Sequence, residues 1–203
     1  MTREEEDLLV SKVQGGDSAS FEKLVLENQT RVYNLALRMV GNEEDAFDMS
    51  QEAFIKAYNS IGNFRGDSRF SVWLYRLTTN VCLDFLRAEN RKNHSSLTYL
   101  SDEDDDKELD IPDERFSPET IAEKKELREA VHKGLMSLPN DYRAILLLRE
   151  IDGLSYDEIA KILSLEEGTV KSRIFRARKR LCAILSAEGN FLNNHSSKKS
   201  KGV

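Results

Sequence analysis

The sequence predicts an all-α fold of two small helical domains joined by a flexible acidic linker. Three observations support this prediction. Only three prolines and ten glycines are spread over 203 residues, which favours helices over a turn-rich β fold. Apolar residues recur at three- and four-residue steps, without the alternation typical of strands. Residues 94–118 show neither period, carry an acidic run and hold two of the three prolines, as expected of a connector.

The N-terminal domain, residues 1–93, is expected to contain four helices. Gly15 and Gly41 follow the first two helices, as C-terminal caps do. The apolar period places the helices at about 3–14, 18–40, 43–60 and 70–92, with a loop at 61–69. The last three helices each carry an apolar stripe that should face the core: Phe21, Leu24, Val25, Val32, Leu35, Ala36 and Met39; Ala46, Phe47, Ala53, Phe54, Ala57 and Tyr58; and Phe70, Leu74, Leu77, Val81 and Phe85.

The C-terminal domain, residues 119–187, should hold four more helices. Pro139 separates the first pair and Gly153 the next pair. Ser155 and Glu158 have the spacing of a capping box, which satisfies free amides at a helix start. The period places the helices at about 119–137, 140–151, 155–163 and 166–187. Residues 188–203 form a polar tail that is predicted to be disordered.

The charge of the chain is distributed unevenly. The formal net charge is −6, but residues 101–120 alone carry ten acids and two bases, a net −8. The remainder is therefore slightly basic, at +2. Because the acidity belongs mainly to the linker, the overall charge is a poor guide to binding partners.

The most basic segment, residues 168–181, follows a helix-turn-helix spacing. Ala160, Ser164 and Val170 supply a small residue where helices approach, a small turn residue and a β-branched residue that locks the second helix. A basic helix held in this way fits the major groove of duplex DNA. The alternative is a solvated basic helix, but such helices normally mix both signs of charge. The segment has no acid and six cations: Lys171, Arg173, Arg176, Arg178, Lys179 and Arg180. Its inner stripe should be Val170, Ile174, Leu181 and Leu185.

An acidic face is expected on the helix at 43–60. Asp45, Asp48 and Glu52 recur at i, i+3 and i+7 and therefore share one face, with Gln51 and Ile55 beside them. This face is either ordinary solvated surface or a docking face for a basic partner helix. Periodicity alone leaves both interpretations open.

A mixed aromatic and basic segment spans residues 64–92. Aromatic rings and cations on one surface suit an unstacked single strand, because the rings take bases and the cations follow phosphates. The alternative is a core helix, and for Trp73 and Tyr75 inward packing is the favoured interpretation. The segment contains Phe64, Phe70, Trp73, Tyr75, Arg65, Arg69, Arg76, Arg87, Arg91 and Lys92, with a polar stripe at Asn80, Asp84, Arg87 and Arg91.

Three long motifs together resemble the extracytoplasmic-function (ECF, group IV) sigma factors of bacteria. These are EDAFDMSQEAFIKAYNSI, then NFRGDSRFSVWLYRLTTNVCLDFLR, and, after the acidic linker, LPNDYRAILLLREIDGLSYDEIAKILSLEEGTVKSRIFRARKRL. The resemblance covers residues 15–187 apart from the linker. It implies that residues 1–93 correspond to sigma region 2 and residues 119–187 to region 4. It also implies a cytoplasmic transcription initiation factor without catalytic residues, cofactor or metal.

The resemblance implies specific partners and site residues. The partners are core RNA polymerase, promoter DNA and an anti-sigma factor that is often membrane-bound, with residues 139–151 meeting the β flap. The positions that match the segment docking on the β′ clamp helices are Asp45, Asp48, Gln51, Glu52 and Ile55. Those matching minus-ten contacts are Asn63, Phe64, Arg65, Ser68, Arg69, Trp73, Asn80, Asp84 and Arg87. Those matching minus-thirty-five contacts are Thr169, Lys171, Ser172, Arg173, Phe175, Arg176, Arg178 and Lys179.

Other functions fit the sequence less well. A one-component helix-turn-helix regulator would need a sensing domain, and the N-terminal half shows no strand alternation that suggests one. An enzyme would need a constellation, yet the three histidines form no HxxxH or HxE pair and no Walker-type glycine loop is present. Cys82 and Cys182 lie in no CxxC pair, so reduced thiols in the cytoplasm are expected. No apolar window is long enough for a membrane span, and the N-terminus lacks a signal-peptide core.

Overall fold

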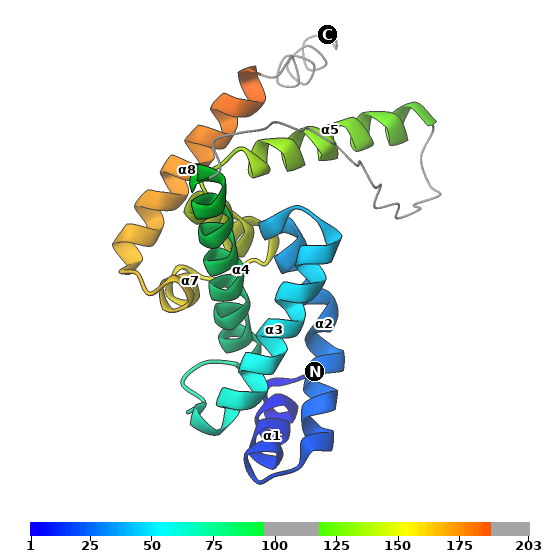
Figure 1. Cartoon of the computed structure of the whole chain (residues 1–203), viewed down its shortest axis with the longest axis vertical. Helices are drawn as coiled ribbons and strands as arrows, with labels where there is room; N and C mark the ends of the chain where they lie inside the picture. Colours follow the sequence, from blue (N-terminus) through cyan, green and yellow to red (C-terminus); the bar gives the residue numbers. More distant parts are fainter. Residues whose placement is uncertain (96–117, 188–203) are drawn as a thin grey trace, which may run out of the picture.

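The structure is a computed structural model that describes residues 1–95 and 118–187. Within those ranges it contains eight α-helices and no strand. The N-terminal lobe consists of α1 (Arg3–Gln14), α2 (Ser18–Val40), α3 (Glu43–Ser60), the 3-10 turn η1 (Ile61–Asn63) and α4 (Phe70–Ser95). The C-terminal lobe consists of α5 (Pro118–Met136), α6 (Asn140–Leu146), the π-helical turn η2 (Leu147–Ile151), α7 (Tyr156–Leu163) and α8 (Glu167–Ala187). The all-α prediction is confirmed (Figure 1).

The helix boundaries follow the caps that the sequence offers. Thr2 and Ser155 each close a capping box, at the starts of α1 and α7. Gly41 caps α2 in the left-handed region at φ 96°, a conformation that glycine adopts without strain. One prediction needs correction: the single helix expected at 140–151 is α6 followed by η2, because the amide of Asp152 reaches back five residues to the oxygen of Leu147.

The N-terminal core confirms most of the predicted stripes. Leu24, Val32 and Phe70 are almost completely buried. Two assignments were wrong: Phe47 is 56% exposed and Tyr58 is 50% exposed on the outer side of α3. The three alanines of α3 form its inward face instead, because they let α2 and α4 approach closely: Ala46, Ala53 and Ala57.

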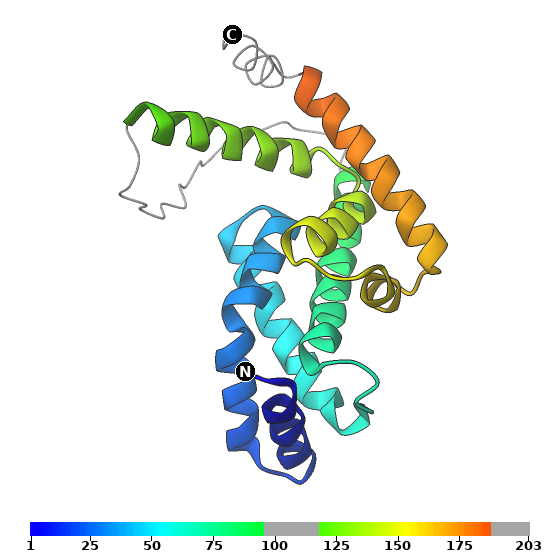
Figure 2. The ribbon, with the colours of Figure 1, turned by 180° about the vertical axis from the view of Figure 1, so that it is seen from behind.

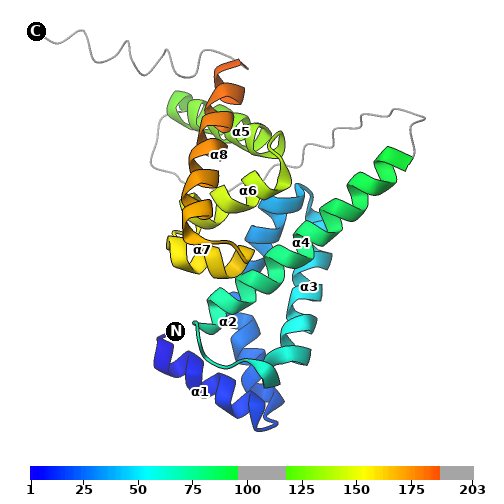
Figure 3. The ribbon, with the colours of Figure 1, turned by 90° about the vertical axis from the view of Figure 1, so that its left-hand side faces the viewer.

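The two lobes pack against each other rather than standing apart. Helix α4 lies between them and contacts α2 and α3 on one side and α6 and α7 on the other (Figures 1 and 3). One continuous buried cluster joins Met39 and Cys82 of the first lobe to Leu148 and Ile159 of the second. Seen from behind, α8 runs along the outer edge of the C-terminal lobe (Figure 2). The acidic linker, predicted at 94–118, falls almost entirely outside the described residues, as does the predicted disordered tail at 188–203.

Candidate nucleic-acid interface

The turn between α7 and α8 has the geometry that the sequence spacing predicts. Ser164 ends α7 in the left-handed region at φ 53° and ψ 49°. The amide of Leu165 then donates to the oxygen of Ala160, which closes the turn. Beyond it, Val170 and Ile174 are buried at 0% and 2% exposure. The second helix of the motif is therefore fixed by its inner side and free to present its outer side.

The outer side of α8 carries an exposed aromatic ring among cations. Phe175 is 70% exposed, the most exposed of the large apolar side chains in the described part of the chain. Such exposure has no packing reason, since burying a phenylalanine ordinarily stabilises a fold. Most of the residues expected to read duplex DNA are exposed beside it, namely Lys171, Arg176, Arg178 and Lys179, whereas Thr169, Ser172 and Arg173 are half-buried.

Two of the cations on α8 are already paired with acids. The ammonium of Lys171 lies 2.6 Å from a carboxylate oxygen of Glu167, and this hydrogen bond raises the pKa of Lys171. Arg178 donates two hydrogen bonds to one carboxylate oxygen of Glu150, which lies in η2: one from Nε at 3.0 Å and one from a terminal nitrogen at 2.5 Å. The sequence predicted both cations as unpaired, because only residues 168–181 entered the count. Glu167 lies just before that range, and Glu150 is 28 residues from Arg178. Exposed pairs of this kind contribute little to stability.

A second polar surface forms at the loop between η1 and α4. Asn63 and Arg65 are exposed there, and Gly66 turns the chain at φ 75°. Phe64 is half-buried and its ring packs on Trp73 with 5.0 Å between centroids. Trp73, expected on the DNA-contacting surface, lies instead in the core at 8% exposure, also against Phe70. It therefore supports the loop from beneath, because its ring is almost completely covered.

The polar stripe of α4 continues this surface toward the C-terminal lobe. Asn80, Asp84 and Arg87 are all exposed, as expected. Arg87 pairs with Asp84 at 3.1 Å and lies 3.9 Å from Asp141 of α6. The stripe thus borders the other lobe in this arrangement.

The acidic face of α3 is exposed in part. Asp48 and Gln51 are exposed, while Asp45 and Glu52 are half-buried. Asp45 engages the cap residue Asn42, and Glu52 lies 3.3 Å from Lys56.

Two apolar side chains stand on the same side of α3. Ile55 is 54% exposed, and Phe47 lies two turns before it at 56% exposure. Sequence reasoning missed Phe47 because it assigned the ring to the core. An acidic surface with exposed apolar groups is typical of a face that docks a partner.

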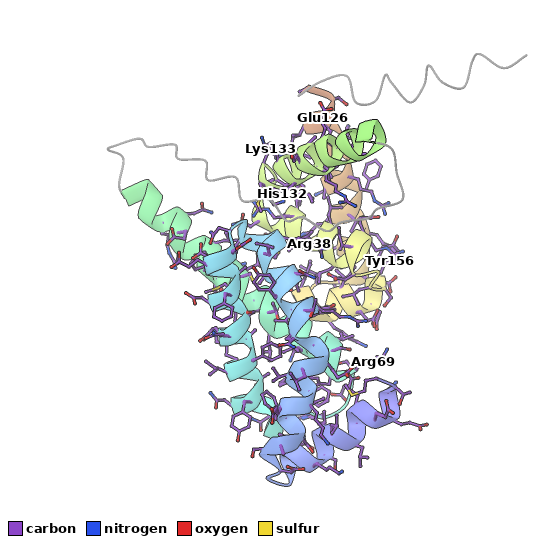
Figure 4. All side chains as sticks on the ribbon, turned by 90° about the vertical axis from the view of Figure 1, so that its right-hand side faces the viewer. Arg38, Arg69, Glu126, His132, Lys133 and Tyr156 are labelled. Atoms are coloured by element: carbon purple, nitrogen blue, oxygen red, sulfur yellow. The ribbon has the colours of Figure 1, made fainter. Side chains whose placement is uncertain are left out.

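The three surfaces lie on different sides of the molecule. Helices α8 and α3 lie on opposite sides of α4 (Figures 1 and 3). Arg69 of the loop lies close to one end of α1, while Tyr156 is on α7 of the other lobe (Figure 4).

Two cations flank the Tyr156 ring. Arg149 lies 4.7 Å and Lys171 5.4 Å from its centroid.

Metal-ligating groups and cysteines are the remaining candidates for chemistry. Among them no group of three or more His, Cys, Asp or Glu side chains is placed to hold a metal ion. Burial raises the pKa of the Cys82 thiol to about 12, so it is a poor nucleophile. Cys182 is exposed. None of the helices in residues 1–95 and 118–187 has the length and apolar character needed to cross a membrane.

Two family models match the chain. The model for sigma-70 region 2 matches residues 24–92, and the model for sigma-70 region 4 matches residues 128–181. Each match lies within one lobe, and together they leave out α1, the start of α2, about half of α5 and the end of α8.

The chain is also similar to named relatives over most of its length. It is 43% identical to the RNA polymerase sigma-H factor of Pseudomonas aeruginosa over 182 residues, which are 88% of this chain and 92% of that protein. It is 43% identical to the ECF RNA polymerase sigma-E factor of Escherichia coli K12 over 173 residues, 85% and 90% of the two chains.

Solved structures share the fold. CnrH, solved in complex with the cytosolic domain of CnrY, matches with a TM-score of 0.65 at 25% identity, over 91% of this chain and 99% of that one. The sigma factor RpoE of Bartonella quintana matches with a TM-score of 0.63 at 24% identity, over 83% and 98%.

Proposed function

Because the chain belongs to the extracytoplasmic-function sigma factors of the sigma-70 family, we propose that its three exposed surfaces divide the tasks of transcription initiation. The outer side of α8 reads duplex DNA at the minus-thirty-five element. The loop at 61–69 and the polar stripe of α4 hold the melted minus-ten strand. The outer side of α3 docks on core RNA polymerase.

The observation that carries this proposal is the helix-turn-helix with its exposed ring and cations. Val170 and Ile174 hold α8 from within, so the backbone can present Phe175 and Arg176 in a fixed orientation. Residues near the start of such a helix reach base edges, and later cations grip phosphates. Lys171, Ser172, Phe175 and Arg176 are the proposed base readers, with Arg178 and Lys179 on phosphates.

The minus-ten surface follows the same logic for a single strand. Asn63 and Arg65 are exposed on the loop, and Arg69 closes it. Extruding a base from the stack costs a few kcal/mol, and contacts of the base with this surface would offset that cost. Binding to the open strand then shifts the duplex toward melting without any nucleotide hydrolysis. Because Trp73 is buried, its proposed role changes from base contact to support of Phe64.

The partners follow from the family. Asp48 and Gln51, with the apolar Ile55 and Phe47, form the proposed face for the clamp helices of the polymerase β′ subunit. Residues 139–151 are the proposed segment for the β flap. Because residues 143–148 are buried, this contact would fall to the exposed Pro139, Asp141, Glu150 and Ile151. CnrH is solved with a protein partner, the cytosolic domain of CnrY. By extension, this chain would bind an anti-sigma factor, which is often attached to the membrane in this family. The chain itself would act in the cytoplasm and without catalytic activity of its own. A one-component regulator is not supported, because region 2 accounts for the N-terminal lobe.

Run-off transcription with core polymerase tests the proposal. The chain should form a stable holoenzyme and start transcripts at defined sites on a promoter library, which core polymerase alone does not do. Arg176→Ala should weaken minus-thirty-five binding and leave core affinity intact, whereas Asp48→Arg should do the reverse. Lys23→Ala, an exposed change on α2, serves as the control. Failure to form a holoenzyme, or equal loss of both activities in each variant, would overturn the assignment.

A further inference from the structure

Helix α1 contacts the minus-ten loop at the end where the loop begins. The side-chain amide of Gln14 donates two hydrogen bonds from its nitrogen, to the main-chain oxygens of Ile61 and Phe64, both at 2.9 Å. These partners lie 47 and 50 residues away in sequence. One amide group on α1 thus fixes both sides of the η1 turn that starts the loop.

A second residue of α1 holds the other end of the loop. The carboxylate of Glu6 is 3% exposed, which is unusual for an acid. Its Oε1 accepts from the amide of Ser71 in the first turn of α4, at 3.1 Å. Its Oε2 lies 3.6 Å from Nε of Arg69, and within the described residues no hydrogen bond reaches that oxygen.

Burying this carboxylate costs free energy that packing alone does not recover. A buried ion pair is weak evidence for stability, so we assign this carboxylate a positional role. It accepts from one free amide, that of Ser71, at the start of α4, where negative charge is favoured, and it lies beside Arg69. Glu6 therefore fixes the point at which the loop becomes helix.

The two contacts sit on one rigid element. Glu6 and Gln14 are eight residues apart on a continuous helix, or about 12 Å along its axis. Val10 and Val13 between them are buried in the N-terminal core. Because both contacts come from α1, this helix sets the distance between the two ends of the loop.

The loop needs this support because it has few bonds of its own. Among the described residues, one side-chain hydrogen bond stays within residues 64–69: the Ser68 hydroxyl donates to the main-chain oxygen of Arg69, at 3.3 Å. Gly66 adds local freedom at φ 75°. A loop that is ordered before binding loses less conformational entropy when it captures a strand.

We propose that α1 is a brace for the minus-ten loop, with Glu6 and Gln14 as its positioning residues. The proposal rests on the function proposed above and extends it to a helix outside the matched region 2, which starts at residue 24. Neither residue contacts DNA in this proposal. They act by holding Asn63 and Arg65 in the geometry that captures the extruded base.

Binding of single-stranded DNA by the assembled holoenzyme tests the brace. The probe is a fluorescent strand selected by the wild-type holoenzyme from a random single-stranded pool. Gln14→Glu is nearly isosteric but has no donor for the two carbonyls, so we expect about tenfold weaker binding and lower discrimination between bases. Gln14→Ala should weaken strand binding about threefold to fivefold. Glu6→Gln should weaken it by a similar factor, because Arg69 loses its charged partner.

Matched controls separate positioning from general damage. Glu4→Gln on α1 and Gln29→Ala on α2 alter exposed residues and should bind as the wild type does. All variants should keep core affinity, duplex minus-thirty-five binding and melting temperature close to the wild-type values. If Gln14→Glu and Glu6→Gln bind the strand with unchanged affinity and base discrimination, the brace is wrong while the proposed function stands. If the wild-type holoenzyme selects no strand, the minus-ten assignment itself fails.

Discussion

Arg143 of α6 donates a hydrogen bond to the main-chain oxygen of Met39, at the end of α2 in the other lobe. The side chain of Arg143 is 6% exposed, and burial lowers the pKa of its guanidinium. Carbonyls at a helix C-terminus lack partners within the helix and attract cations. The same guanidinium also donates to three oxygens at the end of α5 and just beyond: Leu135 at 3.1 Å, Met136 at 2.6 Å and Leu138 at 3.4 Å.

Replacing Arg143 should destabilise the packed arrangement of the lobes. Arg143→Ala leaves four carbonyls without this donor, and we expect a loss of about 3 kcal/mol in the free energy of unfolding. Arg143→Lys keeps the charge but not the planar fork, so it should lose about 2 kcal/mol. Thermal unfolding measures the loss, and small-angle scattering should show a larger radius of gyration for the alanine variant.

Arg176→Ala is the control for Arg143, since it removes an exposed arginine from the same lobe. It should change the free energy of unfolding by less than about 0.5 kcal/mol. A lysine variant as stable as the wild type would show that the multiple donors of Arg143 are dispensable. An unchanged radius of gyration in an unstable alanine variant would place the effect within the C-terminal lobe alone.

Asp152 should make the stability of the packed lobes depend on pH. It lies near Tyr75 between the lobes, and burial raises its pKa, while Arg38, the Tyr75 hydroxyl and Arg31 lower it. The folded chain therefore takes up a proton more readily than the unfolded chain. The stabilising contribution of protonation is complete below the unfolded pKa and is lost as the pH rises through the raised folded pKa. Asp152→Asn should thus be more stable than the wild type near neutral pH and equal to it in acid.

Melting temperatures measured across the acidic to neutral range check this expectation. Asp48→Asn, an exposed change on α3, provides the control and should follow the wild-type curve. A gap between wild type and Asp152→Asn that stays constant with pH would contradict a titrating carboxylate at this position.

Most helices could be predicted from sequence because their signals are local. Capping residues and apolar periods lie within one segment, as at Ser155 and Gly41. The same periods misplaced Phe47 and Tyr58, because a three- and four-residue step cannot distinguish a core ring from an exposed one beside the core face. The Tyr58 ring is partly covered at the surface by an edge-to-face contact with the Phe21 ring, with 5.0 Å between centroids.

The contacts between distant segments could not be predicted. The bond from Arg143 to Met39 joins residues 104 apart, and the pair of Arg178 with Glu150 joins residues 28 apart. A single sequence carries no local pattern for such pairs. For the candidate site, the order of motifs predicted which residues lie on α8 and on the loop. The sequence left Trp73 open between inward packing and contact with DNA, and the structure places it in the core.

The two cysteines should differ in reactivity. Burial raises the pKa of Cys82 to about 12, and it lies in the cluster shared by the lobes, whereas Cys182 is exposed on α8. A thiolate is the reactive form, so a thiol reagent at pH 8 should modify one cysteine quickly in the folded chain and the second only after unfolding. The Cys182→Ser variant should lose the fast phase. Rapid labelling of Cys82 in the folded chain would show that the lobes separate readily in solution.

Phe175 should matter for DNA and not for the fold. Because its ring is 70% exposed, Phe175→Ala should change the free energy of unfolding by less than about 0.5 kcal/mol. Its loss should weaken minus-thirty-five binding by the holoenzyme about tenfold, because the ring is placed to contact a base edge or a thymine methyl.

Leu127→Ala is the control for Phe175→Ala. It removes another exposed apolar side chain, on α5, and should leave DNA binding unchanged. Affinities measured at several salt concentrations separate the two kinds of contact: Phe175→Ala should keep the wild-type salt slope, whereas Lys179→Ala should reduce it by about one. A Phe175→Ala variant that binds as tightly as the wild type would remove this ring from the reading surface.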